Sequence, residues 1–169
     1  ICLLHLVIGS PVNADDTEIY IRGSNTPIKP NVTFIIDTSG SMGARVELEN
    51  GDSNKNIKTR LEVVQEVFNG YIDGASGINV NLMRFSKNAN GGYFLTPMQD
   101  VNDNTRDDLK DIVNQLTPGG STPLAETLYE AGQYYRGDQV FFGNTSIPAT
   151  NHPGVLDPSN TDRYKSPTK

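Results

Sequence analysis

The chain has 169 residues and a net charge of -6, and it is long enough for one domain with its own hydrophobic core. An acidic chain without a basic stripe is unsuited to nucleic acid or to an anionic membrane surface, because both attract clustered lysine and arginine. The single cysteine, Cys2, excludes a disulfide framework within the chain.

The first residues are similar to the end of a secretory signal. Residues 1–8 are apolar apart from His5, and Val12-Asn13-Ala14 places small residues where such a signal is usually cleaved. We therefore expect residues 1–14 to be a signal peptide remnant; the alternative is a short buried strand or helix of the mature fold. Polar residues 15–30 predict an extended leader. No apolar run is long enough to span a bilayer, so we expect an exported chain without a transmembrane span.

A strand followed by three oxygen-bearing side chains forms the most informative pattern. Residues 32–36 are apolar and rich in β-branched side chains, which predicts a buried strand. Asp37, Ser39 and Ser41 follow directly, and Gly40 allows the sharp turn that lets them converge. Ligands bind outside the carboxyl ends of strands in open α/β sheets. An oxygen-only set suits Mg²⁺, Mn²⁺ or Ca²⁺ better than zinc or copper.

The next part of the chain predicts a loop, a helix and two strands. Residues 43–58 are polar, and we expect a surface loop. Thr59 and Glu62 have the spacing of a capping box, and apolar residues then recur every three or four positions, which predicts an amphipathic helix. Residues 78–85 alternate as a strand with one apolar face, and residues 93–95 predict a strand paired with it as a hairpin.

A second helix is predicted over residues 105–116. Asp107 and Asp108 would lie in its first turn, where the helix dipole favours acidic side chains. The stretch from Asp100 to Asp111 can also be interpreted as a calcium loop. Its sixth place holds Thr105 instead of the glycine that a calcium loop needs, so a capped helix start is the preferred interpretation.

A third helix is predicted to begin at Pro123, with Thr122 as its N-cap. Its expected buried stripe consists of Leu124, Leu128, Ala131 and Tyr135. Gly119 and Gly120 precede it and allow their loop to approach the first one closely. Residues 138–169 contain four prolines and no clear element. We expect a polar loop or insertion that leads to a strand beyond the chain.

These motifs resemble the von Willebrand factor A domain, whose metal-ion-dependent adhesion site reads Asp-x-Ser-x-Ser, then a distant Thr and a distant Asp. The first three residues match Asp37, Ser39 and Ser41 in FIIDTSGSM. The threonine matches Thr122 in GGSTPLAETLYEAGQYY, and the final Asp has no counterpart in this sequence. The resemblance covers residues 31–137, interpreted as an incomplete domain of this family.

The resemblance implies an α/β, Rossmann-like fold: an open, mainly parallel sheet with helices on both faces, truncated at its C-terminal side. It implies a site for Mg²⁺, or Mn²⁺ or Ca²⁺, made of Asp37, Ser39, Ser41 and Thr122. The ligand-binding loops would lie near Gly119, Gly120 and Ser121. One carboxylate and three neutral hydroxyls leave such an ion under-neutralised, so a carboxylate from a protein ligand could complete its coordination.

A narrower resemblance comes from STPLAETLYEAGQYYRG, the signal-like start and the tail YKSPTK. Together they are similar to the N-terminal region of PilY-type type IV pilus biogenesis and tip adhesin proteins. This implies a metal-dependent adhesion domain of an exported protein, located in the periplasm, outer membrane, pilus tip or cell surface. Its implied partners are pilus subunits and a host or surface receptor. The alternative is an exported scaffold or assembly module whose metal is only structural.

An enzyme is the remaining alternative, since two apolar residues followed by Asp-Thr-Ser-Gly also resemble the catalytic triplet of aspartic proteases. That chemistry needs a second triplet or a symmetric dimer in an all-β fold. The sequence contains no second triplet, and amphipathic helices follow the first. We therefore expect no enzymatic activity. Taken singly, Asp37 could be a turn residue and Thr122 an N-cap; the two motifs together favour the metal site.

Overall fold

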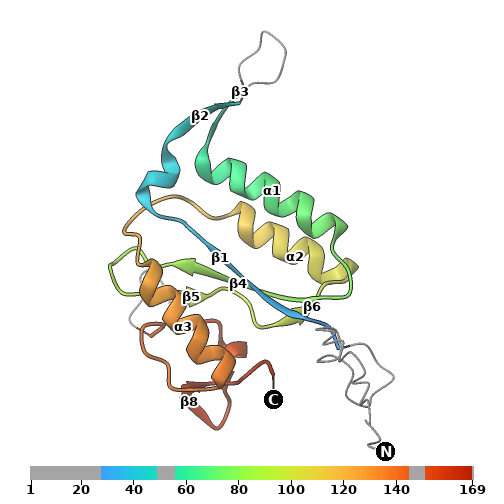
Figure 1. Cartoon of the computed structure of the whole chain (residues 1–169), viewed down its shortest axis with the longest axis vertical. Coiled ribbons are helices and arrows are strands. Elements are labelled where there is room, and N and C mark those ends of the chain that lie inside the picture. Colours follow the sequence, from blue (N-terminus) through green and yellow to red (C-terminus); the bar gives the residue numbers. More distant parts are fainter. Residues whose placement is uncertain (1–27, 49–55, 145–150, 169) are drawn as a thin grey trace, which may run out of the picture.

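Four strands form the central sheet of the computed structural model, which describes residues 28–48, 56–144 and 151–168 (Figure 1). These strands are β1 (Asn31–Ile36), β4 (Asn79–Phe85), β5 (Gly92–Phe94) and β6 (Gln99–Asp100). The predicted signal remnant and most of the predicted leader lie outside the described residues.

The sheet is mixed. β1 and β4 are parallel, whereas β5 and β6 each pair with β4 in the antiparallel direction. The α/β class and the hairpin that follows β4 are confirmed, but one pairing in three is parallel where a mainly parallel sheet was expected. The reason is local: the connection from β4 to β5 is too short for a parallel crossover, which needs a dozen or more residues.

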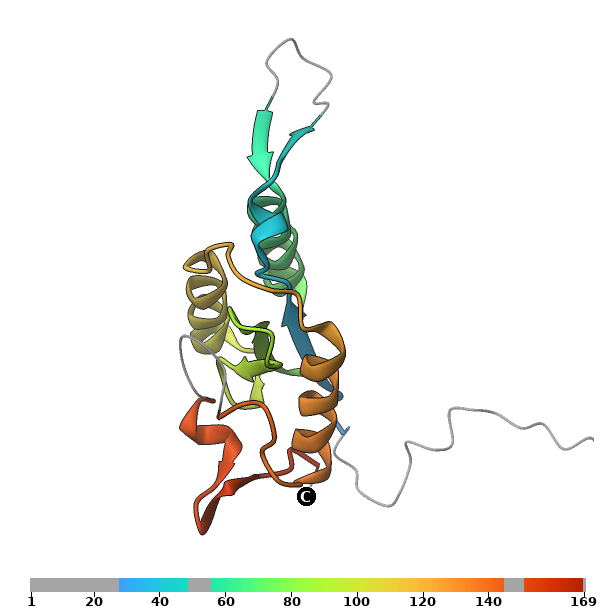
Figure 2. The same ribbon diagram turned by 90° about the vertical axis from the view of Figure 1, so that its left-hand side faces the viewer.

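Helices cover both faces of the sheet, as predicted (Figure 2). They are α1 (Arg60–Gly74), α2 (Asp103–Asn114) and α3 (Leu124–Arg136). On one face, α1 and α2 pack around Val80 and Leu82 of β4. On the other face, α3 packs on Met83. β4 is therefore buried on both faces, and Asn81 is as inaccessible as its apolar neighbours. The predicted single apolar face is wrong, because α3 covers the second one.

The N-terminus of α1 confirms the predicted capping box. The Glu62 amide donates to the Thr59 hydroxyl at 3.2 Å, and the Thr59 amide donates to the Glu62 carboxylate at 2.6 Å. The Thr59 amide and the Thr59 hydroxyl both donate to this carboxylate, and they hold the pKa of the Glu62 carboxyl below its ordinary value. The helix start is thus fixed by local sequence.

A β-ribbon replaces the surface loop predicted over residues 43–58. β2 (Arg45–Leu48) and β3 (Asn56–Thr59) pair in the antiparallel direction, with Arg45 opposite Thr59. The ribbon projects from the sheet beside the start of α1 (Figures 1 and 2). Its few apolar residues stand among polar ones, so the alternation that marks a strand is too short to recognise.

α2 begins two residues before its predicted start. Asn102 is the N-cap, and its side chain accepts from the amides of Asn104 at 3.0 Å and Thr105 at 3.2 Å. The capped helix start is therefore confirmed over the calcium loop. The acid in the first turn is Asp103, whereas Asp107 and Asp108 lie further along the helix.

α3 turns a different face inward from the one predicted. Pro123 occupies the N-cap position, so Thr122 is not the N-cap. Leu124 and Leu128 are 58% and 61% exposed, and of the four predicted stripe residues only Ala131 is fully buried. The buried residues of α3 are Thr127, Glu130, Ala131, Gln133 and Tyr134.

Glu130 explains this orientation. Its fully buried carboxylate accepts from the amides of Phe141, Phe142 and Gly143 at 3.1, 2.9 and 3.2 Å, and from the hydroxyl of Tyr164. A buried carboxylate is tolerated when charge-assisted hydrogen bonds replace its water. Burial and the neighbouring carboxylate raise the pKa of Tyr164, which therefore stays a donor.

Regular elements also occur within residues 138–169, where a polar loop was expected. They are η3 (Pro153–Val155), β7 (Leu156–Asp157) and β8 (Asn160–Tyr164). Val155 and Tyr164 pack with Phe94 of the sheet and Tyr134 of α3. Single apolar residues in a proline-rich stretch carry no periodicity, so this packing was not predictable from local pattern.

We predict that Glu130→Gln lowers the free energy of unfolding by about 2–4 kcal/mol, because an amide offers one acceptor where the loop presents several donors. Urea unfolding followed by circular dichroism measures the change. Glu126→Gln on the same helix is the control, with an expected effect within about 0.5 kcal/mol. Equal stabilities of the two variants would contradict the role given to Glu130.

Candidate functional site

The four predicted site residues lie on two loops. Asp37, Ser39 and Ser41 follow the carboxyl end of β1, where the chain enters the short 3-10 helix η2 (Gly40–Gly43). Thr122 lies in the loop that leads into α3. Ligand sites of open α/β sheets occur at this edge.

Backbone hydrogen bonds join the two loops directly. The Gly40 amide donates to the Gly120 carbonyl at 3.0 Å, and the Gly119 amide donates to the Thr38 carbonyl at 2.8 Å. The close approach predicted from the two glycines is therefore present. Because the contact is made by main-chain groups, it does not need a bound ion to form.

Gly120 is the position where glycine is required. Its φ is +87°, and a Cβ added there would lie 2.4 Å from the carbonyl oxygen of Lys87. Gly119 differs, since a Cβ there would meet no atom within 4 Å. The loop therefore depends on Gly120 for its shape and on Gly119 for its amide hydrogen bond.

Hydrogen bonds within the first loop hold the side-chain oxygens of Asp37, Ser39 and Ser41 in place. The Ser39 amide donates to Oδ1 of Asp37 at 2.8 Å, which leaves Oδ2 without a partner among the described residues. Oγ of Ser39 and Oγ of Ser41 lie 3.0 Å apart. Adjacent ligands of an octahedral ion with bonds of about 2.1 Å are separated by about 3.0 Å. The serine pair therefore fits two neighbouring positions around a magnesium-sized cation.

Solvent can reach this edge of the sheet. Ser41 and Thr122 are exposed, Asp37 is half-buried and Ser39 is buried. The Thr122 carbonyl accepts from the Leu124 amide at 2.9 Å, while its hydroxyl bonds to none of the residues that the structure describes. That hydroxyl is therefore available to a ligand.

A third segment completes the edge, and sequence reasoning missed it. The Ser121 amide donates to the Lys87 carbonyl at 3.2 Å, and the Thr38 hydroxyl donates to the Phe85 carbonyl at 3.3 Å. Lys87 is exposed and makes no ion pair within the described ranges. The signal was available, because β4 runs parallel to β1 and its following turn must lie at the same edge.

No group of three or more His, Cys, Asp or Glu side chains that could hold a metal occurs in the described part of the chain. A cation at this edge would therefore depend on one carboxylate and several hydroxyls. Oxygen ligands of this kind suit Mg²⁺, Mn²⁺ and Ca²⁺, which take few or no nitrogen and sulfur ligands.

A helix-flanked sheet with loops converging at the carboxyl ends of its parallel strands defines the class of Rossmann-like α/β domains. The family model described as von Willebrand factor type A domain matches residues 32–152. The chain therefore belongs to this family. Among the described helices, none is long and apolar enough to cross a membrane.

The chain is also similar to several solved structures. An uncharacterised membrane-spanning protein from Vibrio fischeri is 24% identical with a TM-score of 0.50, and the match covers 62% of this chain and 48% of that one. A von Willebrand factor type A protein from Catenulispora acidiphila is 20% identical with a TM-score of 0.47, covering 63% and 23%. The PilB minor pilin from Streptococcus sanguinis is 20% identical with a TM-score of 0.46, covering 63% and 26%.

The chain thus spans about half or less of the length of these proteins. A search of curated proteins gave no match.

We predict that Gly120→Ala lowers the free energy of unfolding by about 2–4 kcal/mol, because the new Cβ would meet the Lys87 backbone at a strained φ. Gly119→Ala is the matched control and should change stability by less than about 1 kcal/mol. Urea unfolding distinguishes them. Similar losses for both variants would show that the loop has no special requirement at Gly120.

Proposed function

We propose that this protein is a metal-ion-dependent binding domain without enzymatic activity. Asp37, Ser39, Ser41 and Thr122 would hold one Mg²⁺, or Mn²⁺ or Ca²⁺ in its place. A carboxylate from a protein ligand would occupy an open coordination position. The 3.0 Å separation of the two serine oxygens beside Asp37 is the observation that carries the proposal.

Charge supports an acidic ligand. One carboxylate and three neutral hydroxyls do not neutralise a divalent ion, so positive charge remains at the edge of the sheet. Lys87 adds a further positive charge to the same edge, where its backbone supports the loop of Gly120. An approaching carboxylate would gain from both.

The start of α3 supports a protein as the ligand. Leu124 follows Thr122 by two residues, and Leu124, Leu128 and Tyr129 of this helix are 58%, 61% and 48% exposed. Exposed apolar side chains beside a charged site are typical of surfaces that bind other proteins.

The biological setting follows from the sequence resemblance alone. The similarity to PilY-type proteins and the signal-like residues 1–14 suggest an exported protein of the periplasm, outer membrane, pilus tip or cell surface. Its partners would then be pilus subunits and a host or surface receptor, and its role would be pilus assembly and adhesion.

We predict that Asp37→Ala weakens the binding of Mg²⁺ and Mn²⁺ at least tenfold, because it removes the only carboxylate of the predicted set. Calorimetric titration measures the affinity, and unfolding in chelator should show that the fold is kept. Asp108→Ala on the exposed side of α2 is the control. Identical metal affinities of parent and Asp37→Ala would exclude the site.

The alternative function is a scaffold or assembly module whose metal only stabilises the loops. The hydrogen bonds between Gly40 and Gly120 and between Gly119 and Thr38 already join these loops, which favours a metal that serves ligand binding. We predict that a short peptide with one aspartate displaces water from bound Mn²⁺, measured as a fall in water proton relaxation. Thermal stabilisation by the ion without any effect of the peptide would favour the scaffold.

A further inference from the structure

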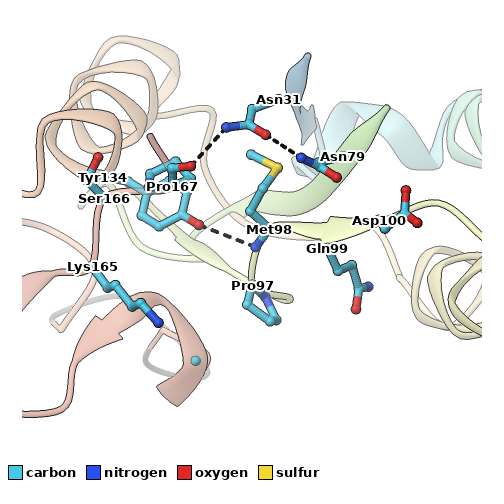
Figure 3. Close-up of a pocket in the computed structure, with 11 residues that line it drawn as sticks. Asn31, Asn79, Pro97, Met98, Gln99, Asp100, Tyr134, Lys165, Ser166 and Pro167 are labelled. Carbon is cyan, nitrogen blue, oxygen red and sulfur yellow. Dashed lines mark hydrogen bonds between the residues drawn. The ribbon is translucent and has the colours of Figure 1, made fainter. Parts of the chain in front are cut away.

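A polar cleft of about 270 Å³ opens at the amino ends of β1 and β4 (Figure 3). Asn31 and Asn79, the first residues of these strands, form part of its wall. The rest comes from residues 97–100, 165–167, Tyr134 and Gly154. Since a strand rises about 3.3 Å per residue, the six residues of β1 place this cleft about 20 Å from the loop of Asp37. It is a separate site.

Hydrogen bonds fix the walls of the cleft. The Asn31 side chain donates to the Pro167 carbonyl at 3.0 Å, and the Asn79 side chain donates to Oδ1 of Asn31 at 2.8 Å. The Met98 amide donates to the Tyr134 hydroxyl at 3.3 Å. These bonds connect the sheet, α3 and the last described segment, so the cleft is formed before any ligand binds (Figure 3).

Tyr134 supplies a buried donor without an acceptor. The residue is only 2% exposed, and its hydroxyl accepts from Met98 while its own proton meets no acceptor within the described ranges. Burial raises the pKa of Tyr134, so that proton stays in place. Buried hydroxyls normally both donate and accept. A ligand atom in the cleft could accept this proton.

The charged groups of the cleft stand on opposite sides. Lys165 and Asp100 lie on opposite sides of Met98 and Pro97 (Figure 3). Lys165 is exposed and has no ion-pair partner among the residues that the structure describes. Oδ1 of Asp100 accepts from Lys29 at 2.6 Å, which leaves Oδ2 open.

Two neutral side chains, Asn79 and Gln99, also line the cleft and add hydrogen-bonding groups to it. Oδ1 of Asn79, on the side of Asp100, has no hydrogen-bond donor in the described part of the chain. The side-chain amide of Gln99 lies between the two sides and has no described partner, so it can both donate and accept. The cleft thus offers donors on one side, acceptors on the other and an amide in the middle.

We propose that this cleft binds a zwitterionic ligand of dipeptide size. Its carboxylate lies toward Lys165 and Tyr134, and its ammonium group lies toward Asp100 and Asn79. The peptide group between them meets the amide of Gln99. A volume of 270 Å³ corresponds to about nine water molecules, which is in the range of a dipeptide with small side chains.

The two charged groups of the cleft favour this ligand class. A simple anion would gain from Lys165 alone, and a simple cation would gain only from Oδ2 of Asp100, because Oδ1 is already paired with Lys29. A molecule with both charges gains on both sides. Pro97 and Met98 form a small apolar wall between the two sides of the cleft, and this wall fits a ligand with short side chains.

The probe is the dipeptide Ala-Ala, titrated into the full chain in the presence of a chelator so that the metal loop plays no part. Calorimetry or amide NMR shifts measure the binding. Acetylation of its amino group or amidation of its carboxyl group should each weaken binding about tenfold, since each removes one charge-assisted contact. No binding of Ala-Ala, or equal binding of the three forms, overturns the proposal.

Two variants test which side of the cleft binds each charged group of the dipeptide. Lys165→Gln should weaken Ala-Ala about five- to tenfold and leave the amidated form unchanged; Asp100→Asn should weaken Ala-Ala and leave the acetylated form unchanged. Arg60→Gln, which removes an exposed positive charge at the start of α1, is the control and should change nothing. Circular dichroism verifies folding. An effect of Arg60→Gln equal to that of Lys165→Gln overturns the assignment.

Discussion

The parallel pairing of β1 with β4 decides where every loop of the candidate metal site lies. Parallel strands end at the same edge, so the turn of Asp37 and the turn of Lys87 emerge side by side. The loop of Gly120 then bridges them, with its carbonyl bonded to Gly40 and its α-carbon against Lys87. A side chain at Gly120 would separate the segments. The site is thus a consequence of strand direction and one narrow backbone contact.

Glu130 is a second fixed point of the structure, on the face of the sheet that α3 covers. Its carboxylate joins α3 to the amides of Phe141, Phe142 and Gly143 and to Tyr164 of β8. The same helix begins two residues after Thr122, so the interaction that fixes its rotation also orients the start of the candidate binding surface. Leu124 and Leu128 are exposed because the opposite face of the helix is taken by this polar network.

The two ends of β1 carry different chemistry. At its carboxyl end, hydroxyls and one carboxylate would hold a cation, and Lys87 would add to the positive charge that attracts an acidic protein ligand. At its amino end, Lys165 and the open Oδ2 of Asp100 lie on opposite sides of a preformed cleft. A strongly charged ligand suits the first end and a zwitterion suits the second, so the two proposals can be tested separately with the same protein.

Local signals in the sequence determined β1, the Thr59 cap of α1, the α/β class and the order of the loops that carry Asp37 and Thr122. These features depend on residues that are near one another in the chain, so their spacing can be recognised in the sequence. Tertiary structure alone decided the face that α3 buries, the β2–β3 ribbon and the packing of Val155 and Tyr164. The physical reason is that a carboxylate such as Glu130 becomes a core residue only when backbone donors from a distant segment replace its water, and hydropathy does not record that exchange.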